Sequence, residues 1–288
     1  MRAAEGELRA WSGKRKRVGM LPLAAACLLA PADAGSQEVP ARWERRLEAS
    51  EPRAAIFHAS VGIHLPTAET LAKGEWQFEI SHRFFPALSD GAEAFWGLDG
   101  PVNMRIGLGY ALSDRAMATL ARSNVLDSWD LQVKLRALEG RLGTVPVAAA
   151  LLGGIGLSSD VPDRDALDSG NFQYYGQVAL NARLGERWAV GVVPSYLHNL
   201  RVEEDEEEGD AFLGLNTRVQ VTKVVGLEGE WNLSRSREDL ENDMGSFGIE
   251  LETGGHFFKI FLTNSVHLNP GQYLAGSPFA FEPEEWRL

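Results

Sequence analysis

The sequence predicts an all-β protein, an antiparallel up-and-down transmembrane β-barrel of about twelve strands. Three observations predict it. Apolar and polar residues alternate through most segments after residue 73, and side chains that repeat every two residues belong to strands. The connections between these segments alternate between short and long. An apolar segment of the kind found in export signals precedes them all.

Length and composition limit the classes of protein that remain. The 288 residues suffice for one large all-β domain or two small ones. A net charge of −12 argues against a nucleic-acid binder, which needs a basic face. The single cysteine excludes a disulfide framework and any site built from several cysteines.

The first 34 residues have the parts of a signal peptide. "KRKR" (14–17) is a basic region, "VGMLPLAAACLLAPA" (18–32) is an apolar region, and "ADA" (32–34) is a small-x-small cleavage site. The apolar run is short for a membrane helix of roughly 20 residues, and a lipidated Cys27 is an alternative. We therefore expect a cleaved signal peptide at 1–34, an N-terminal linker and periplasmic segment at 35–73, and a barrel at 74–288.

Eleven segments are expected to form strands, and most are close to the 9–11 residues that cross a bilayer when tilted. Ala116–Ser123 and Val145–Leu157 alternate less regularly than the others. In chain order the segments are Gly74–Phe84, Val102–Leu112, Ala116–Ser123, Ser128–Leu138, Val145–Leu157, Tyr174–Gly185, Trp188–His198, Ala211–Thr222, Val225–Leu233, Ser246–Glu252 and His256–Asn264.

The connections between these segments favour an up-and-down barrel. Those at 113–115, 139–144, 185–187, 223–224 and 253–255 are short, and those at 85–101, 158–173, 199–210 and 235–245 are long. Such alternation gathers all tight turns at one rim, which faces the periplasm in outer-membrane barrels. A Greek-key sandwich has no reason to sort its loops in this way.

Alternation alone does not say which face meets lipid. Trp76, Trp129, Trp188 and Trp231 lie at or near strand ends, as residues of an interfacial girdle do. Together with the export signal and the strand lengths, they favour apolar side chains that face lipid. A secreted soluble β-barrel that binds a ligand in its interior is the alternative.

With the apolar face outward, eight charged side chains are expected to line the lumen. Mixed charges of this kind either pair across strands and plug a narrow barrel or line a water-filled path, and both remain open. The eight residues are Glu79, Arg83, Arg105, Asp130, Lys134, Arg136, Arg183 and Arg218.

Three motifs invite a chemical interpretation. His58 and Ser60 are spaced as in the His-x-Ser pair of outer-membrane lipid hydrolases, but no acidic partner is evident, so a structural role is favoured. The acidic run at 203–210 lacks the spacing of a calcium loop and is expected to be a solvated outer loop. The glycines of "ETGGH" (252–256) suit a tight hairpin. We expect no catalytic residues, no metal site and no cofactor.

Several stretches resemble an uncharacterised bacterial family of outer-membrane β-barrels, a domain of unknown function. They are "ISHRF" (80–84), "FWGLDG" (95–100), "GLGYALSDR" (107–115), "PSYLHN" (194–199) and "IELETGGHFFKIFLTNS" (249–265). The resemblance implies an exported barrel in the outer membrane of a Gram-negative-type cell, in contact with lipid and without assigned site residues. A non-enzymatic narrow channel or a component of an envelope complex is the expected role, with protein partners unknown.

The end of the sequence carries a separate expectation. Eleven strands are odd in number, whereas bacterial single-chain barrels have an even count. "EEWRL" (284–288) looks like the start of a returning twelfth strand that is cut short. We expect Trp286–Leu288 to begin pairing beside Gly74–Phe84 or Phe257–Asn264 and to leave a gap along that seam.

Overall fold

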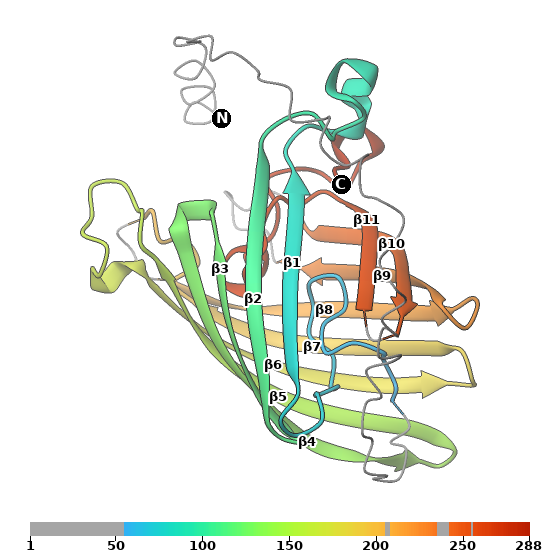
Figure 1. Ribbon diagram of the computed structural model, residues 1–288. Helices are drawn as coiled ribbons and strands as arrows, with labels where there is room; N and C mark the ends of the chain where they lie inside the picture. Colours follow the sequence, from blue (N-terminus) through green and yellow to red (C-terminus); the bar gives the residue numbers. More distant parts are fainter. Residues whose placement is uncertain (1–54, 205–207, 235–241, 255) are drawn as a thin grey trace, which may run out of the picture. The chain divides into compact units, whose positions relative to one another are not determined.

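The computed structural model describes residues 55–204, 208–234, 242–254 and 256–288, which hold eleven β-strands in one antiparallel sheet (Figure 1). Each strand pairs with its neighbours in sequence, from β1 at one edge to β11 at the other. The strands are β1 (Trp76–Phe84), β2 (Val102–Ser113), β3 (Ala116–Ser123), β4 (Ser128–Leu142), β5 (Val145–Ser158), β6 (Phe172–Leu184), β7 (Trp188–His198), β8 (Gly209–Gln220), β9 (Val225–Leu233), β10 (Met244–Thr253) and β11 (His256–Thr263).

The helical elements are short. In the described ranges they are η2 (Leu88–Ala94), η3 (Val125–Asp127), η4 (Ser169–Asn171), α2 (Pro270–Tyr273) and η5 (Pro283–Glu285). None of the helices described is long and apolar enough to cross a membrane. The expected signal peptide at 1–34 and the first part of the expected linker lie outside the described residues.

The expected all-β, up-and-down fold is confirmed, and all eleven expected strand segments coincide with β1–β11. The tight connections after β2, β4, β6, β8 and β10 lie at one end of the strands, here called the short-turn rim. The connections after the other strands lie at the opposite end, the long-loop rim. The loops are therefore sorted as the sequence predicts.

One expected turn is wrong. Residues 139–142 continue β4 and pair with β5 as far as Leu142 opposite Val145, so the hairpin turn shrinks to two residues. Gly143 sits in this turn at φ 62°, a conformation that costs glycine little. Because both strands run on past the neighbouring turns, the β4–β5 hairpin extends beyond the short-turn rim.

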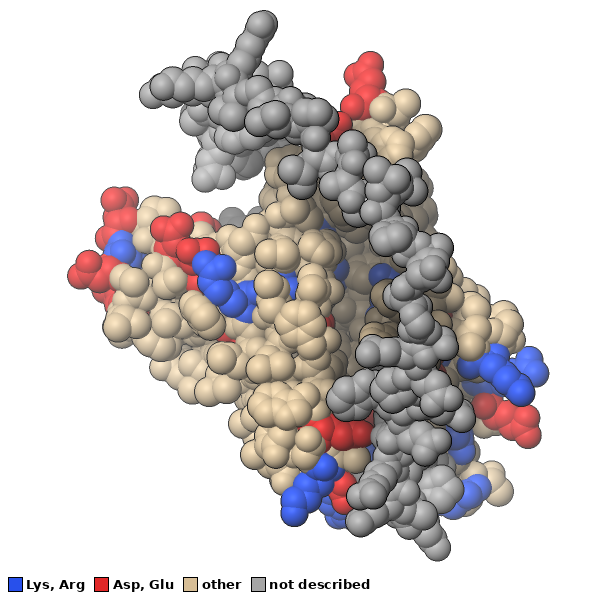
Figure 2. Space-filling model, viewed as in Figure 1, with Lys and Arg blue, Asp and Glu red and all other residues tan. Residues whose placement is uncertain are grey.

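The sheet is apolar on its outer face and polar on its inner face. On β4, Leu131 and Val133 are 50% and 49% exposed, whereas Asp130 before them and Lys134 after them are 1% and 2% exposed. Figure 2 shows mainly uncharged residues over the middle of the strands, with Lys, Arg, Asp and Glu gathered at their ends. In water such an outer face would be a large exposed apolar surface that promotes aggregation, but it suits contact with the hydrocarbon core of a bilayer.

The two edges of the sheet approach each other at the long-loop rim, with the C-terminal residues between them. Arg287 makes an antiparallel bridge with Thr263 of β11, with N···O distances of 2.8 and 3.0 Å. On the other side, the Phe84 amide of β1 donates to the Leu288 carbonyl at 2.8 Å. Arg287 and Leu288 thus bond to the two edges, whereas the Trp286 carbonyl accepts from the Leu88 amide of η2. In the described chain β1 and β11 do not pair directly with each other, which leaves the expected gap along the seam.

The burial pattern of β4 predicts which substitutions the membrane penalises. Leu131→Arg places a charge on the outer face at mid-strand and should cost roughly 2–4 kcal/mol of folding free energy in lipid. Gln132→Arg points to the inner face and should cost much less. Folding titrations of both variants in lipid vesicles measure the difference. Equal costs, or the reverse order, would contradict the assignment of the two faces.

Candidate functional site

The interior of the curved sheet is occupied by the chain's own N-terminal segment. Residues 55–73, here called the plug, run along the inner face ahead of β1 and appear as the blue trace within the sheet in Figure 1. Phe57, Leu65, Thr67 and Ala68 of the plug are 0–2% exposed. The expectation of a linker and periplasmic segment therefore does not describe residues 55–69, which are packed against the strands.

The plug turns back on itself in a small loop. Val61 and Pro66 form an antiparallel bridge, and the Gly62 amide donates to the Leu65 carbonyl at 2.9 Å. This leaves the amides of residues 63–65 pointing to the same side. Irregular backbone buried in this way must find hydrogen-bond partners outside its own segment.

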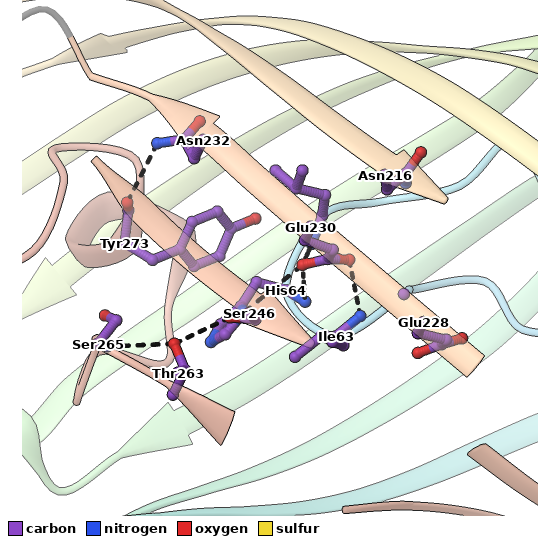
Figure 3. A network of polar contacts seen from close by, with 12 residues as sticks. Ile63, His64, Asn216, Glu228, Glu230, Asn232, Ser246, Thr263, Ser265 and Tyr273 are labelled. Atoms are coloured by element: carbon purple, nitrogen blue, oxygen red, sulfur yellow. Dashed lines mark hydrogen bonds and ion pairs between the residues drawn. The ribbon is translucent and has the colours of Figure 1, made fainter. Parts of the chain in front are cut away.

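Glu230 of β9 supplies that partner. Its carboxylate accepts hydrogen bonds from the amides of Ile63 and His64, each at 2.7 Å, and from that of Leu65 at 3.2 Å (Figure 3). Three successive amides around one carboxylate form an anion-binding nest. A Cβ at Gly62 would collide with the same carboxylate, so the close approach requires glycine there.

Lysines on the inner face hold the plug's carbonyl groups. Lys134 of β4 donates to the carbonyls of Ser60 and Glu69. Lys259 of β11 donates to the carbonyls of Val61 and Gly62 at 3.1 and 2.9 Å. Both lysines therefore bind main-chain carbonyl groups of the plug, so the inner face satisfies part of the backbone of this segment.

Other polar side chains continue the same pattern along the plug. Arg136 donates to the Ala68 carbonyl at 2.8 Å and forms an ion pair with Glu69. Asn181 accepts from the Ala68 amide, and Arg183 donates to the Ala55 carbonyl at 3.3 Å. The plug is thus anchored from one end to the other.

All eight charged residues expected to line the lumen lie on the inner face. Five of them are buried and three are partly exposed, and several meet the plug rather than open space. Arg105 pairs with Glu79 at 2.7 Å, and Arg218 pairs with Glu250 at 2.8 Å. The buried five are Arg83, Asp130, Lys134, Arg136 and Arg218, and the partly exposed three are Glu79, Arg105 and Arg183.

The expected set omitted four inner-face residues that matter as much. Glu228 and Glu230 of β9, Glu250 of β10 and Lys259 of β11 form one cluster, in which Lys259 lies 3.0 Å from Glu228 and 3.1 Å from Glu250. The alternation in "VGLEGEWNL" already places the two glutamates of β9 on the polar face. The sequence therefore indicates that both glutamates face inward, but it does not indicate that Glu230 contacts the plug.

The interior is also filled from the long-loop rim by the C-terminal loop, residues 264–282. Asn269 donates to the Ser128 hydroxyl at 2.8 Å, and Gln173 donates to the Gly271 carbonyl at 2.8 Å. Asn232 donates to the Leu274 carbonyl at 3.0 Å. The loop's backbone is therefore held by inner-face amides, much as the plug is held by charges.

An apolar layer, here called the septum, forms where the plug and the C-terminal loop meet. Leu65 of the plug and Leu274 of the loop are both fully buried in it. Leu65 packs so closely on β8 that a Cβ at Gly214 would lie 2.8 Å from its methyl carbons. The septum comprises Leu65, Tyr175, Val193, Leu197, Leu200, Phe212, Met244, Tyr273, Leu274 and Ala275.

The motifs singled out for chemistry do not converge. His58 Nδ1 lies 2.7 Å from Glu252 Oε2, whereas the Ser60 hydroxyl donates to Gln77 on β1 at 2.8 Å. The two side chains thus bond to different strands. Within the described ranges, no three His, Cys, Asp or Glu side chains form a group that could hold a metal ion. Residues 205–207 of the acidic run and 255 of "ETGGH" lie outside those ranges.

A cavity of about 240 Å³ lies beside the plug at the short-turn rim. Ile56 and Glu69 of the plug line it together with Arg136 and Glu139 of β4 and Pro146 of β5. The extended β4–β5 hairpin therefore forms one wall of a vestibule that leads to the ion pair of Arg136 and Glu69.

His64 is the titratable group at the centre of the plug. Its ring contacts Arg83, with Nε2 3.0 Å from the guanidinium, and faces Ser246, Glu230 and Tyr273 (Figure 3). Burial, followed by the charges of Arg83 and of the nearby His267, lowers the pKa of His64 well below 6.5. The packed plug therefore holds His64 neutral at pH 7.

Loss of the Glu230 nest should free the loop of the plug. Glu230→Gln turns one acceptor oxygen into a donor that faces the plug amides, and should cost about 1.5–3 kcal/mol of plug stability. Gly62→Ala should free the same amides by collision with the carboxylate. Hydrogen exchange of the amides of residues 63–65 measures the effect, and Glu186→Gln in an exposed turn is the control. Unchanged protection of these amides from exchange in both variants would contradict the role of Glu230 in holding the plug.

Protonation of His64 should also loosen the plug. Because the closed state depresses the pKa of His64, the released state binds the proton first, and the stability that neutral His64 contributes to the plug is lost as pH falls below about 6.5. We expect exchange of the amides of residues 63–65 to rise between pH 7 and pH 5, and less steeply in His64→Gln. His82→Gln, on the outer face of β1, is the control. A pH dependence that His64→Gln leaves unchanged would contradict the role of this ring.

The comparisons with known proteins agree with the fold. The family model described as "Membrane bound beta barrel domain (DUF5777)" matches residues 57–288, which include most of the plug, all eleven strands and the C-terminal loop. Neither a curated protein nor a solved structure matches the chain. The inward polar face, the outward apolar face and this match lead to one conclusion: the chain belongs to the DUF5777 family of membrane-bound β-barrel domains.

Proposed function

We propose that this protein is a non-enzymatic β-barrel of the bacterial outer membrane that acts as a narrow channel, held closed by its plug and its C-terminal loop. The observation that carries the proposal is a charged inner face that binds the backbone of a segment lying outside the strands. Lys134, Glu230 and Lys259 all reach the plug's main chain. A segment held by side chains, and not by a β-ladder, is one that the strands do not need in order to pair.

The cost of the charged interior supports a channel over a permanently filled barrel. Buried ions are expensive to desolvate, and apolar residues of similar volume fill a core at equal or lower cost. Lys134 and Glu230 are nevertheless 2% and 6% exposed behind the plug. Such side chains are well placed once water replaces the plug, because they then line an aqueous path.

The septum is the barrier in the closed state. Leu65, Tyr273 and Leu274 bring apolar surface from both segments into an otherwise polar interior. An apolar constriction excludes water and therefore ions. Movement of the plug would remove Leu65 from this layer and open it from the short-turn rim.

The outer face and the rims of the sheet support this location. An apolar band between charged ends suits a bilayer, and tight turns face the periplasm in outer-membrane barrels. The plug joins β1 at the short-turn rim, the rim that faces the periplasm in such barrels. The expected signal peptide at 1–34 supports export to this membrane, where lipid covers the outer face.

Planar-bilayer conductance tests the channel. The unaltered protein should show little or no current at pH 7. Leu65→Asp places a charge in the septum, and Ala68→Trp cannot fit beside Ala148 and Ala150, so both variants should dislodge the plug and conduct. Glu186→Gln, in an exposed turn, should stay closed. Far-ultraviolet circular dichroism checks that the strands remain, and folded variants that both stay silent would overturn the proposal.

A further inference from the structure

Charges of opposite sign are sorted across the inner face. In the half formed by β1–β6, the inward charges are mostly cations, whereas in the half formed by β8–β11 they are mostly carboxylates. The first half carries Arg83, Arg105, Lys134, Arg136 and Arg183 with Glu79, Asp130 and Glu139. The second half carries Glu228, Glu230, Glu250 and Glu252 with Arg218 and Lys259.

The two halves face each other across the plug. Lys134 on β4 holds the carbonyl groups of Ser60 and Glu69, while Glu230 on β9 holds the amides of residues 63–65 between them. Residues 60–69 of the plug are thus hydrogen-bonded to the cationic half and to the acidic half at the same time. Whatever replaces the plug meets the same two surfaces.

The plug presents a different chemical group to each half of the inner face. It presents the Glu69 carboxylate to Arg136 on the cationic half. It presents a row of N–H donors to Glu230 on the acidic half. An anionic group on one side and hydrogen-bond donors on the other are also the two ends of a zwitterion.

We infer that the open channel selects small zwitterionic solutes, such as free amino acids and short peptides. This inference rests on the proposed channel. The solute's carboxylate takes the place of Glu69 beside Arg136, with Lys134 nearby, and its ammonium group takes the place of the plug amides beside Glu230. Glu228, two residues before Glu230 on the same face of β9, adds to the negative charge there. A simple anion or cation gains from one half and is repelled by the other, whereas a zwitterion lying across the lumen gains from both.

The vestibule at the short-turn rim fits this class of solute. Its volume of about 240 Å³ suits a small molecule, and it opens beside the ion pair of Arg136 and Glu69. Glu139 lies 3.5 Å from Arg136 at its edge. A solute that enters there meets Arg136 as soon as Glu69 has left.

Proteoliposome swelling at pH 7 tests the inference with the full chain carrying Leu65→Asp or, independently, Ala68→Trp. The probes are glycylglycine, which is zwitterionic, and erythritol, an uncharged solute of similar size. Glycylglycine should enter about fivefold faster than erythritol, the size of effect expected from one exposed ion pair. Adding Lys134→Gln or Glu228→Gln should bring the two rates together, whereas adding Glu186→Gln should not.

The outcomes separate the two proposals. Equal rates for both solutes through either opened variant would overturn the zwitterion preference and leave the channel standing. A preference that survives both Lys134→Gln and Glu228→Gln would also overturn it, because the sorted charges would then not be its cause. Absence of swelling by any solute in both opened variants, with circular dichroism showing folded strands, would overturn the channel and the preference together.

Discussion

A polar backbone group in hydrocarbon has no water to bond with, and each unsatisfied group costs several kcal/mol. In the sheet, each strand from β2 to β10 answers this constraint by pairing on both sides, whereas β1 and β11 pair on one side with a strand and meet Arg287 and Leu288 on the other. The constraint also fixes where irregular backbone can lie, since the plug and the C-terminal loop are tolerated only behind the sheet. Their amides and carbonyls need partners there, and the polar inner face provides them.

The partners are of two chemical kinds. Charges from Glu230, Lys134 and Lys259 hold the plug, whereas neutral amides from Gln173 and Asn232 hold much of the C-terminal loop. Charged hydrogen bonds are stronger but leave a costly group behind when they break. When the plug leaves, these charged side chains avoid that cost only if water takes the place of the plug. The chemistry of the interior therefore fits a plug that exchanges with water and a loop that stays.

Much of the sheet could be predicted from the sequence, because a two-residue period is a local property. The period identified all eleven strands and placed Lys134 and Arg136 on the inner face. It failed at residues 139–142, where glycine and charged residues resembled a turn but continue β4. The plug could not be foreseen, since residues 55–73 have no strand period and their burial depends on contacts with distant strands. Glu230 and Ile63, for example, are 167 residues apart.

That separation along the chain has a consequence for the order of folding. The plug is synthesised before any strand, yet its partners include Glu230 of β9 and Lys259 of β11, which lies 198 residues beyond Val61. Contacts this distant form late, because the intervening chain must first be closed into a loop. The strands must therefore assemble around an interior that is still wet. The plug leaves the ribosome before every strand, yet it is among the last parts of the fold to find its place.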